Sequence, residues 1–129
     1  MDGASSNDSS NLMQELRQAY LLQRLRLGAE RFSHIDALEL ATIEGARLLN
    51  RDDIGEIRAG ACADLALFAT DELRFAGAHD LLAALVLSGA HRAEAVMVNG
   101  EWKVRNGELV NVELEKILES QKKAAVALV

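Results

Sequence analysis

The chain of 129 residues has little cysteine, few aromatic residues and no excess of basic charge. Cys62 is the only cysteine, so an intrachain disulfide is impossible, which is typical of a protein in a reducing compartment. Only 4% of the residues are aromatic although 50% are hydrophobic, so the core must consist mainly of Leu, Ala, Val and Ile. The formal net charge of −6 argues against binding to a nucleic-acid backbone.

Long apolar runs are also lacking. The run Leu81 to Leu87 is wholly apolar, but it is far too short to cross a bilayer. The first residues lack the basic start and apolar middle of a secretion signal. We therefore expect a cytoplasmic protein whose partners include neither a membrane nor a nucleic acid.

The first half of the sequence predicts two helices. Residues 1–11 are small and polar like a flexible tail, and a wide apolar stripe over 12–27 predicts a helix covered on more than one side, capped by Ser9 or Ser10 and ended by Gly28. A capping-box spacing at Ser33 and Asp36 predicts a second helix, which extends to about Leu49. The residues predicted on its inner face are Ile35, Leu38, Ala41, Thr42, Gly45 and Leu49. A glycine inside a helix suggests a close neighbour at Gly45.

The second half predicts short strands and two more helices. Strands are expected over 54–57, 64–68, 95–98, 101–104 and 108–110, with hairpin turns at Asn99-Gly100 and Asn106-Gly107. The run Leu81 to Leu87 predicts a short buried helix capped by Asp80 and ended by Gly89, with a buried strand as the alternative. Asn111 is expected to cap a final helix with Leu114, Ile117 and Leu118 on its inner face. The fold class is therefore α+β.

Few residues favour catalytic chemistry by themselves. The histidines His34, His79 and His91 show no H-x-H or H-x-x-x-H spacing, and each is expected to be a solvated loop residue. Cys62 lies between two alanines with no activating motif, which predicts an inert small residue. The Ser and Asn run over 5–11 lacks the glycines and lysine of a phosphate-binding loop and favours a helix cap.

Four sequence blocks resemble the C-terminal end of an amidohydrolase-superfamily enzyme. These are D-G-A-S-S-N-D at 2–8, L-A-T at 40–42 with G-A at 45–46, G-x-I-x-x-G-x-x-A-D-L at 55–65, and V-x-V-N-G at 96–100 with a glycine at 107. The first block, with G-A-H-D at 77–80, is similar to the branch that contains 8-oxoguanine deaminase, guanine deaminase and the s-triazine hydrolases. The departures are Leu81, where the branch has proline, and Cys62, where it has lysine or another polar residue.

The resemblance implies a fold and a chemistry. Members have a (β/α)₈ barrel that binds one divalent metal, Zn²⁺ or Fe²⁺, at the C-terminal ends of its strands, and a metal-bound hydroxide hydrolyses a carbon–nitrogen bond of a purine-like or triazine-like ring. By resemblance, Asp2 is the metal ligand and proton acceptor that follows strand eight. One carboxylate is not a metal site, so we expect no metal on this chain alone and no activity.

By the same resemblance, residues 1–50 are the end of the barrel, 51–110 are the C-terminal half of a composite β-sandwich with an inserted short helix, and 111–129 form a C-terminal helix. We expect a fragment whose uncovered sheet edge and apolar helix face lead to a homo-oligomer or to pairing with a complementing N-terminal half. The alternative is a non-catalytic scaffold or oligomerisation module, or half of a split enzyme.

Overall fold

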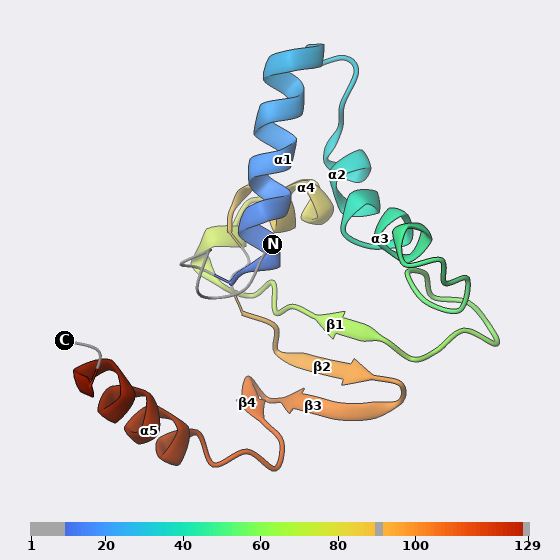
Figure 1. Ribbon diagram of the computed structural model, residues 1–129. Coiled ribbons are helices and arrows are strands. Elements are labelled where there is room, and N and C mark those ends of the chain that lie inside the picture. Colours follow the sequence, from blue (N-terminus) through green and yellow to red (C-terminus); the bar gives the residue numbers. More distant parts are fainter. Residues whose placement is uncertain (1–9, 90–91, 128–129) are drawn as a thin grey trace.

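The computed structural model describes residues 10–89 and 92–127, which form helices beside a small antiparallel sheet (Figure 1). In chain order the elements are α1 (Leu12–Leu27), α2 (His34–Leu40), α3 (Ile43–Leu48), β1 (Leu65–Leu67), the 3₁₀ helix η1 (Leu73–Phe75), α4 (Leu81–Leu87), β2 (Ala95–Val98), β3 (Glu101–Arg105), β4 (Glu108–Leu109) and α5 (Leu114–Ala127). The α+β class is confirmed. None of the helices described is both long and apolar enough to span a membrane.

Helix α1 has the predicted bounds but a different cap. The side chain of Asn11 accepts hydrogen bonds from the backbone N–H of Met13, at 3.0 Å, and of Gln14, at 3.3 Å, so the cap predicted at Ser9 or Ser10 is wrong. Gly28 ends the helix with φ of 93°. The predicted cover on more than one side is also wrong for the described chain, because Leu16 is buried whereas Leu25 is 85% exposed.

The single helix predicted from Ser33 to Leu49 is divided into α2 and α3. Thr42 interrupts it: its Oγ1 donates to the Leu38 carbonyl at 2.7 Å, and its backbone leaves the helical region with φ of −127° and ψ of −96°. Threonine commonly bonds back to a preceding carbonyl and so bends a helix. The predicted capping box is confirmed, since Ser33 and Asp36 exchange both hydrogen bonds.

The inner face of α2 and α3 combines small residues with part of the predicted set, since Leu38 and Ala41 pack against the buried cluster. Ala37 and Ala46 are buried, while Ile35 and Leu49 of the predicted face are exposed. A side chain at Gly45 would meet only the Leu40 carbonyl, at the ordinary contact distance of 3.5 Å, so the close neighbour predicted there is wrong. Small side chains on this face let the neighbouring chain approach closely.

The sheet has the strand order β1-β2-β3-β4, and all its pairs are antiparallel. Both predicted glycine turns are confirmed, because each Asn-Gly pair has positive φ at both residues, as in 49° at Asn99 and 79° at Gly100. The strand predicted over 54–57 is wrong: this segment is a series of bends, with Ile57 90% exposed. The helix predicted over Leu81 to Leu87 is confirmed as α4, capped by Asp80, but only Ala84 and Val86 are buried in it, while Leu81 and Leu82 are about half exposed.

The buried side chains of the described residues lie in the helices and in η1. One cluster contains Leu16, Ala37 and Val86, and a second contains Phe75 and Ala84. Met13 packs against both clusters. Helix α1, helix α2 and helix α4 therefore form one packed unit, and η1 is attached to it through α4.

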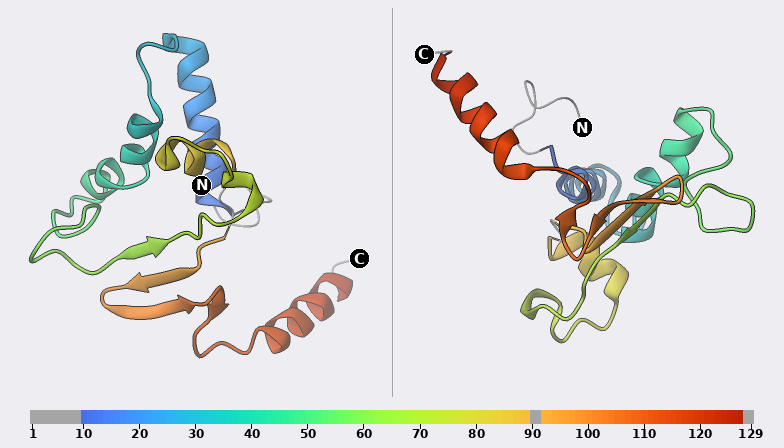
Figure 2. Two further views of the ribbon diagram at one scale, coloured as in Figure 1. Left: turned by 180° about the vertical axis from the view of Figure 1, so that it is seen from behind. Right: turned by 90° about the horizontal axis from the view of Figure 1, so that it is seen from below.

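Helix α5 extends from the end of the sheet away from the other helices (Figures 1 and 2). It begins at Leu114, so Asn111 is not its cap; Asn111 instead has φ of 57° in the preceding turn. The predicted inner face is exposed: Leu114, Ile117 and Leu118 are 51%, 53% and 49% exposed. The expectation that they would pack inward is wrong for the described chain.

Candidate functional site

The principal predicted site residue, Asp2, lies outside the described residues, as does His91. The Ser and Asn run is described only at its end, where Asn11 acts as the cap of α1. This role agrees with the predicted helix cap. The motif residues that the structure describes lie between Leu40 and Gly107.

The described residues do not make a metal site. Over 10–89 and 92–127, no group of at least three His, Cys, Asp or Glu side chains is arranged to hold a metal ion. A catalytic zinc needs about three protein ligands and one open position. These residues do not fit the metal that the sequence resemblance implies, and we derive no reaction step through it.

Two of the three histidines are described, and they differ. His79 is exposed, as predicted. The prediction for His34 is wrong: this residue begins α2, its side chain is 25% exposed, and its Nε2 lies 3.1 Å from Oδ2 of Asp80. Helix α2 packs against α4, which places the two side chains together although they are far apart in sequence.

Asp80 has two contacts, one for each carboxylate oxygen. Its Oδ1 accepts hydrogen bonds from the backbone N–H of Leu82 and Ala83, each at 3.0 Å, while Oδ2 faces His34. The bond from Ala83 holds the pKa of Asp80 below its ordinary value, and His34 lowers that pKa further. Asp80 therefore caps α4 and links it to α2.

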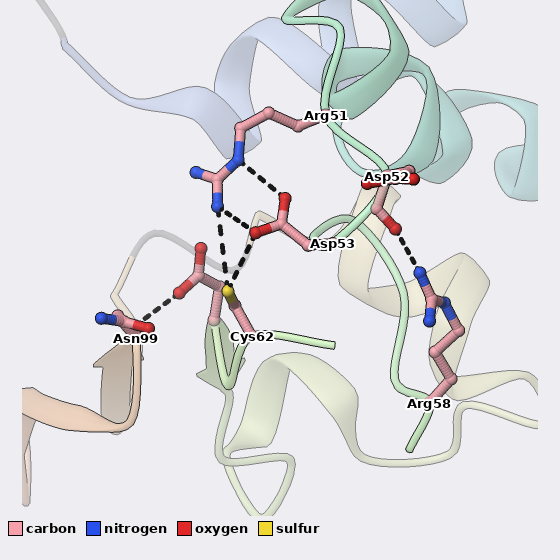
Figure 3. Close-up of polar contacts among 7 residues, drawn as sticks. Arg51, Asp52, Asp53, Arg58, Cys62 and Asn99 are labelled. Carbon is pink, nitrogen blue, oxygen red and sulfur yellow. Dashed lines mark hydrogen bonds and ion pairs between the residues drawn. The ribbon is translucent and has the colours of Figure 1, made fainter. Parts of the chain in front are cut away.

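A polar cluster closes the loop between α3 and β1 (Figure 3). Arg51 donates to both carboxylate oxygens of Asp53, at 2.8 and 2.7 Å. The Cys62 thiol donates to Asp53 Oδ2 at 3.1 Å, and the Cys62 backbone N–H donates to the Asp53 carbonyl at 2.7 Å. In the same loop, Arg58 donates to the carbonyl of Asp52. The cluster ties the two ends of an irregular segment together.

The electrostatics of this cluster favour the protonated thiol of Cys62. Hydrogen bonding from Arg51 holds the pKa of Asp53 far below its ordinary value, with a further contribution from the thiol. The hydrogen bond that the thiol donates to the Asp53 carboxylate raises the pKa of Cys62. Because the thiolate is the nucleophilic form, a raised pKa keeps the group inert at neutral pH. This agrees with the prediction of an inert residue.

The motif blocks meet one another at two places. Asp64, from the A-D-L block, accepts the backbone N–H of Asn99, from the V-N-G block, at 2.6 Å, which fixes β1 to the β2–β3 turn. Gly55 approaches Ala46 so closely that a Cβ would lie 2.9 Å from the Ala46 Cβ. The motif residues therefore act as structural joints. The motifs could be recognised from their spacing in the sequence, but that spacing did not predict which of their residues would contact one another.

Comparison with known proteins gives the family. Residues 1–103 match the Amidohydrolase family, so the chain belongs to the amidohydrolase family, and the resemblance seen in the motifs is confirmed. An 8-oxoguanine deaminase of Pseudomonas aeruginosa is 52% identical over 129 residues, which is 100% of this chain and 29% of that protein. The chain thus spans less than a third of the length of this relative.

Solved structures agree with this family and with the described fold. An adenosine deaminase from Xanthomonas campestris with bound zinc has a TM-score of 0.88 at 27% identity, covering 99% of this chain and 30% of that one. The zinc complex of an atrazine chlorohydrolase from Arthrobacter aurescens TC1 has a TM-score of 0.86 at 34% identity, covering 94% and 28%. The helices and the four-stranded sheet therefore occupy the positions of a contiguous part of these enzymes.

Proposed function

We propose that the chain is the C-terminal part of a metal-dependent aminohydrolase that deaminates a purine-like or triazine-like ring. The observation that carries this proposal is the identity of 52%, spread over the whole chain, with an 8-oxoguanine deaminase. The triazine hydrolase and adenosine deaminase structures support the same class of heterocyclic substrate. A cytoplasmic location, with no nucleic-acid or membrane partner, remains our expectation.

The proposed division of the chain follows the family architecture. Residues 1–50 would be the end of the (β/α)₈ barrel, 51–110 half of a composite β-sandwich with α4 inserted, and 111–129 a terminal helix. The separation between the packed helices and the uncovered sheet supports this division. Both layers would then be completed by chain that this sequence does not contain.

Asp2 is the proposed contribution of this chain to the reacting centre, as a metal ligand and proton acceptor. Zinc in the two neighbouring structures supports zinc as the metal, with Fe²⁺ as the alternative. The three histidines of the sequence include no H-x-H pair, so other ligands must come from elsewhere. We therefore expect the 129 residues alone to be inactive.

A chimera tests this proposal. The chain replaces the matching segment of the Pseudomonas aeruginosa 8-oxoguanine deaminase, and ammonia release from 8-oxoguanine is measured with zinc present. We expect turnover by the chimera and none by the isolated chain. Asp2→Asn should lower the turnover of the chimera by about 100-fold or more, because even loss of a group that only orients a metal ligand costs roughly 10- to 100-fold.

The matched control is Asp71→Asn, which neutralises an exposed carboxylate and should leave turnover unchanged. Clear turnover by the isolated chain would overturn the expected inactivity. A folded, zinc-loaded chimera without activity would favour the second candidate, a non-catalytic scaffold or oligomerisation module. The exposed apolar faces of the sheet and of α5 are the observation that favours that candidate.

A further inference from the structure

Two asparagines of this chain, Asn99 and Asn106, precede a glycine. Such a pair undergoes spontaneous deamidation readily, because glycine has no side chain to hinder attack of its backbone nitrogen on the asparagine side chain. Both asparagines are exposed, so water reaches them. The sequence therefore contains two points of covalent instability, in agreement with the general thermal lability of asparagine.

The reaction at Asn99 needs no reactant other than water. The Gly100 nitrogen loses its proton and attacks the carbonyl carbon of the Asn99 side chain, the side-chain amide takes up a proton and leaves as ammonia, and a succinimide ring remains. Water then opens the ring at either carbonyl, which gives aspartate or isoaspartate. Isoaspartate lengthens the main chain by one methylene, which the tight turn between β2 and β3 cannot accommodate unchanged.

The attacking nitrogen of Gly100 is already engaged in the folded chain. Its N–H donates to the Ala63 carbonyl at 3.1 Å, and the N–H of Asn99 donates to Oδ1 of Asp64 at 2.6 Å. Both acceptors directly precede β1, which pairs with β2. The turn is therefore fastened from outside its own hairpin by the A-D-L block.

These two bonds oppose deamidation in two ways. Attack requires the Gly100 nitrogen to give up the proton that it donates to Ala63 and to turn towards the Asn99 side chain, so the turn must first open. The negative charge of Asp64 beside the turn also disfavours an anionic nitrogen, since like charges at short range oppose ionisation. The reaction therefore proceeds through local opening, as amide hydrogen exchange does.

The second turn is held by different groups. The N–H of Gly107 donates to the Glu94 carbonyl at 2.8 Å, and the guanidinium of Arg92 donates to the Gly107 carbonyl. Neither contact involves Ala63 or Asp64. The turn at Asn106 is therefore an internal control for the turn at Asn99.

We propose that Asn99 is a latent deamidation site, which the hydrogen bonds to Ala63 and Asp64 keep intact in the folded chain. The inference goes beyond the proposed function, since it requires neither metal nor substrate. It also gives the A-D-L block a role towards the V-N-G block, because the first protects the asparagine of the second. Each opening of this part of the sheet exposes the turn to a permanent chemical change.

The first experiment compares the folded 129-residue chain with the same chain unfolded in guanidinium chloride, at one mildly alkaline pH. Trypsin separates the two turns into peptides 93–103 and 106–116, and mass spectrometry measures conversion of amide to carboxyl in each. We expect deamidation at Asn99 to be at least about tenfold slower in the folded chain, because opening must break a hydrogen bond to a charged group. Equal rates would overturn the proposal.

Asp64→Ala tests the protecting contact itself. The rate at Asn99 should rise roughly tenfold, while the rate at Asn106 in the same chain stays unchanged. The matched control is Asp71→Ala, which removes another exposed carboxylate and should change neither rate. In a variant that circular dichroism shows to be folded, an unchanged rate at Asn99 or an equal rise at both turns would contradict the proposal. For a variant that does not fold, the first experiment decides.

Discussion

The helices α1 to α4 and the sheet with α5 differ in how they are stabilised. The six buried hydrophobic side chains of the described chain all belong to the helical unit with η1. The strands are joined by backbone hydrogen bonds, yet Leu67, Trp102 and Leu109 remain 48%, 39% and 48% exposed. The strands are therefore joined by hydrogen bonds with only partial burial of their apolar side chains, whereas full burial stabilises the helical unit.

Strand register shows that the sheet is apolar on both faces. Residues opposite one another in an antiparallel pair share a face, so Leu65, Met97 and Trp102 lie on one side. Val96, Val104 and Leu109 lie on the other side. An antiparallel sheet with one face in water normally alternates apolar and polar residues. Strands β1 (L-A-L) and β2 (A-V-M-V) lack that alternation, which indicates that their part of the sheet is made to be covered on both sides.

The largest expected effect comes from shortening a buried side chain in the helical unit. Leu16→Ala should lower the free energy of unfolding by about 3 kcal/mol, because it opens a cavity in a cluster where the side chain is 4% exposed. Leu25→Ala, in the same helix but 85% exposed, should change it by less than about 0.5 kcal/mol. Urea unfolding measures both.

Leu109→Ala extends this comparison to the sheet. Its side chain is half exposed, so we expect a loss well below that of Leu16→Ala. An equal loss would show that another surface covers this face in solution, and the contrast between the two regions would no longer hold.

The next largest effect is expected at the contact between Gly55, in the loop that leads to the sheet, and Ala46 of α3. Gly55→Ala should destabilise by about 2 kcal/mol, because φ is 90° and the added Cβ would lie 2.9 Å from the Ala46 Cβ. Gly60 has a similar φ of 86°, but a Cβ there would meet no other atom within 4 Å. Gly60→Ala should therefore lower stability through backbone strain alone, and by less than Gly55→Ala. Equal losses in thermal unfolding would mean that the contact with Ala46 contributes nothing.

The smallest effect concerns pH and the loop cluster. The lowered pKa of Asp53 stabilises the loop above the ordinary Asp pKa of about 4, and this stabilisation is lost as pH falls through the lowered value. The raised pKa of Cys62 acts in the opposite direction. Its contribution is present below the ordinary thiol pKa of about 8.5 and is lost as pH rises above it.

Alkylation of Cys62 with iodoacetamide measures this effect. The rate should rise with pH later than for the unfolded chain, and Asp53→Asn should shift the rise to lower pH. Asp71→Asn should not alter the profile. A thiol in the folded chain that titrates at or below its ordinary pKa would contradict the hydrogen bond to Asp53.

Features that depend on neighbouring residues could be predicted from the amino-acid order alone. The end of α1 at Gly28, the capping box at Ser33 and the Asn99-Gly100 turn follow from local hydrogen bonding and allowed backbone angles, and each was predicted. The family also followed from short motifs, because their spacing is a property of the sequence itself.

Packing between distant segments controls which groups meet and which remain exposed. Helix packing brings His34 to Asp80, and loop closure brings Cys62 to Asp53, across separations that no local pattern encodes. The exposure of Leu114 and Ile57 was equally beyond prediction, since burial depends on whether another surface is present to cover a side chain. Local pattern sets the direction in which a residue points, whereas its environment is set by the rest of the molecule.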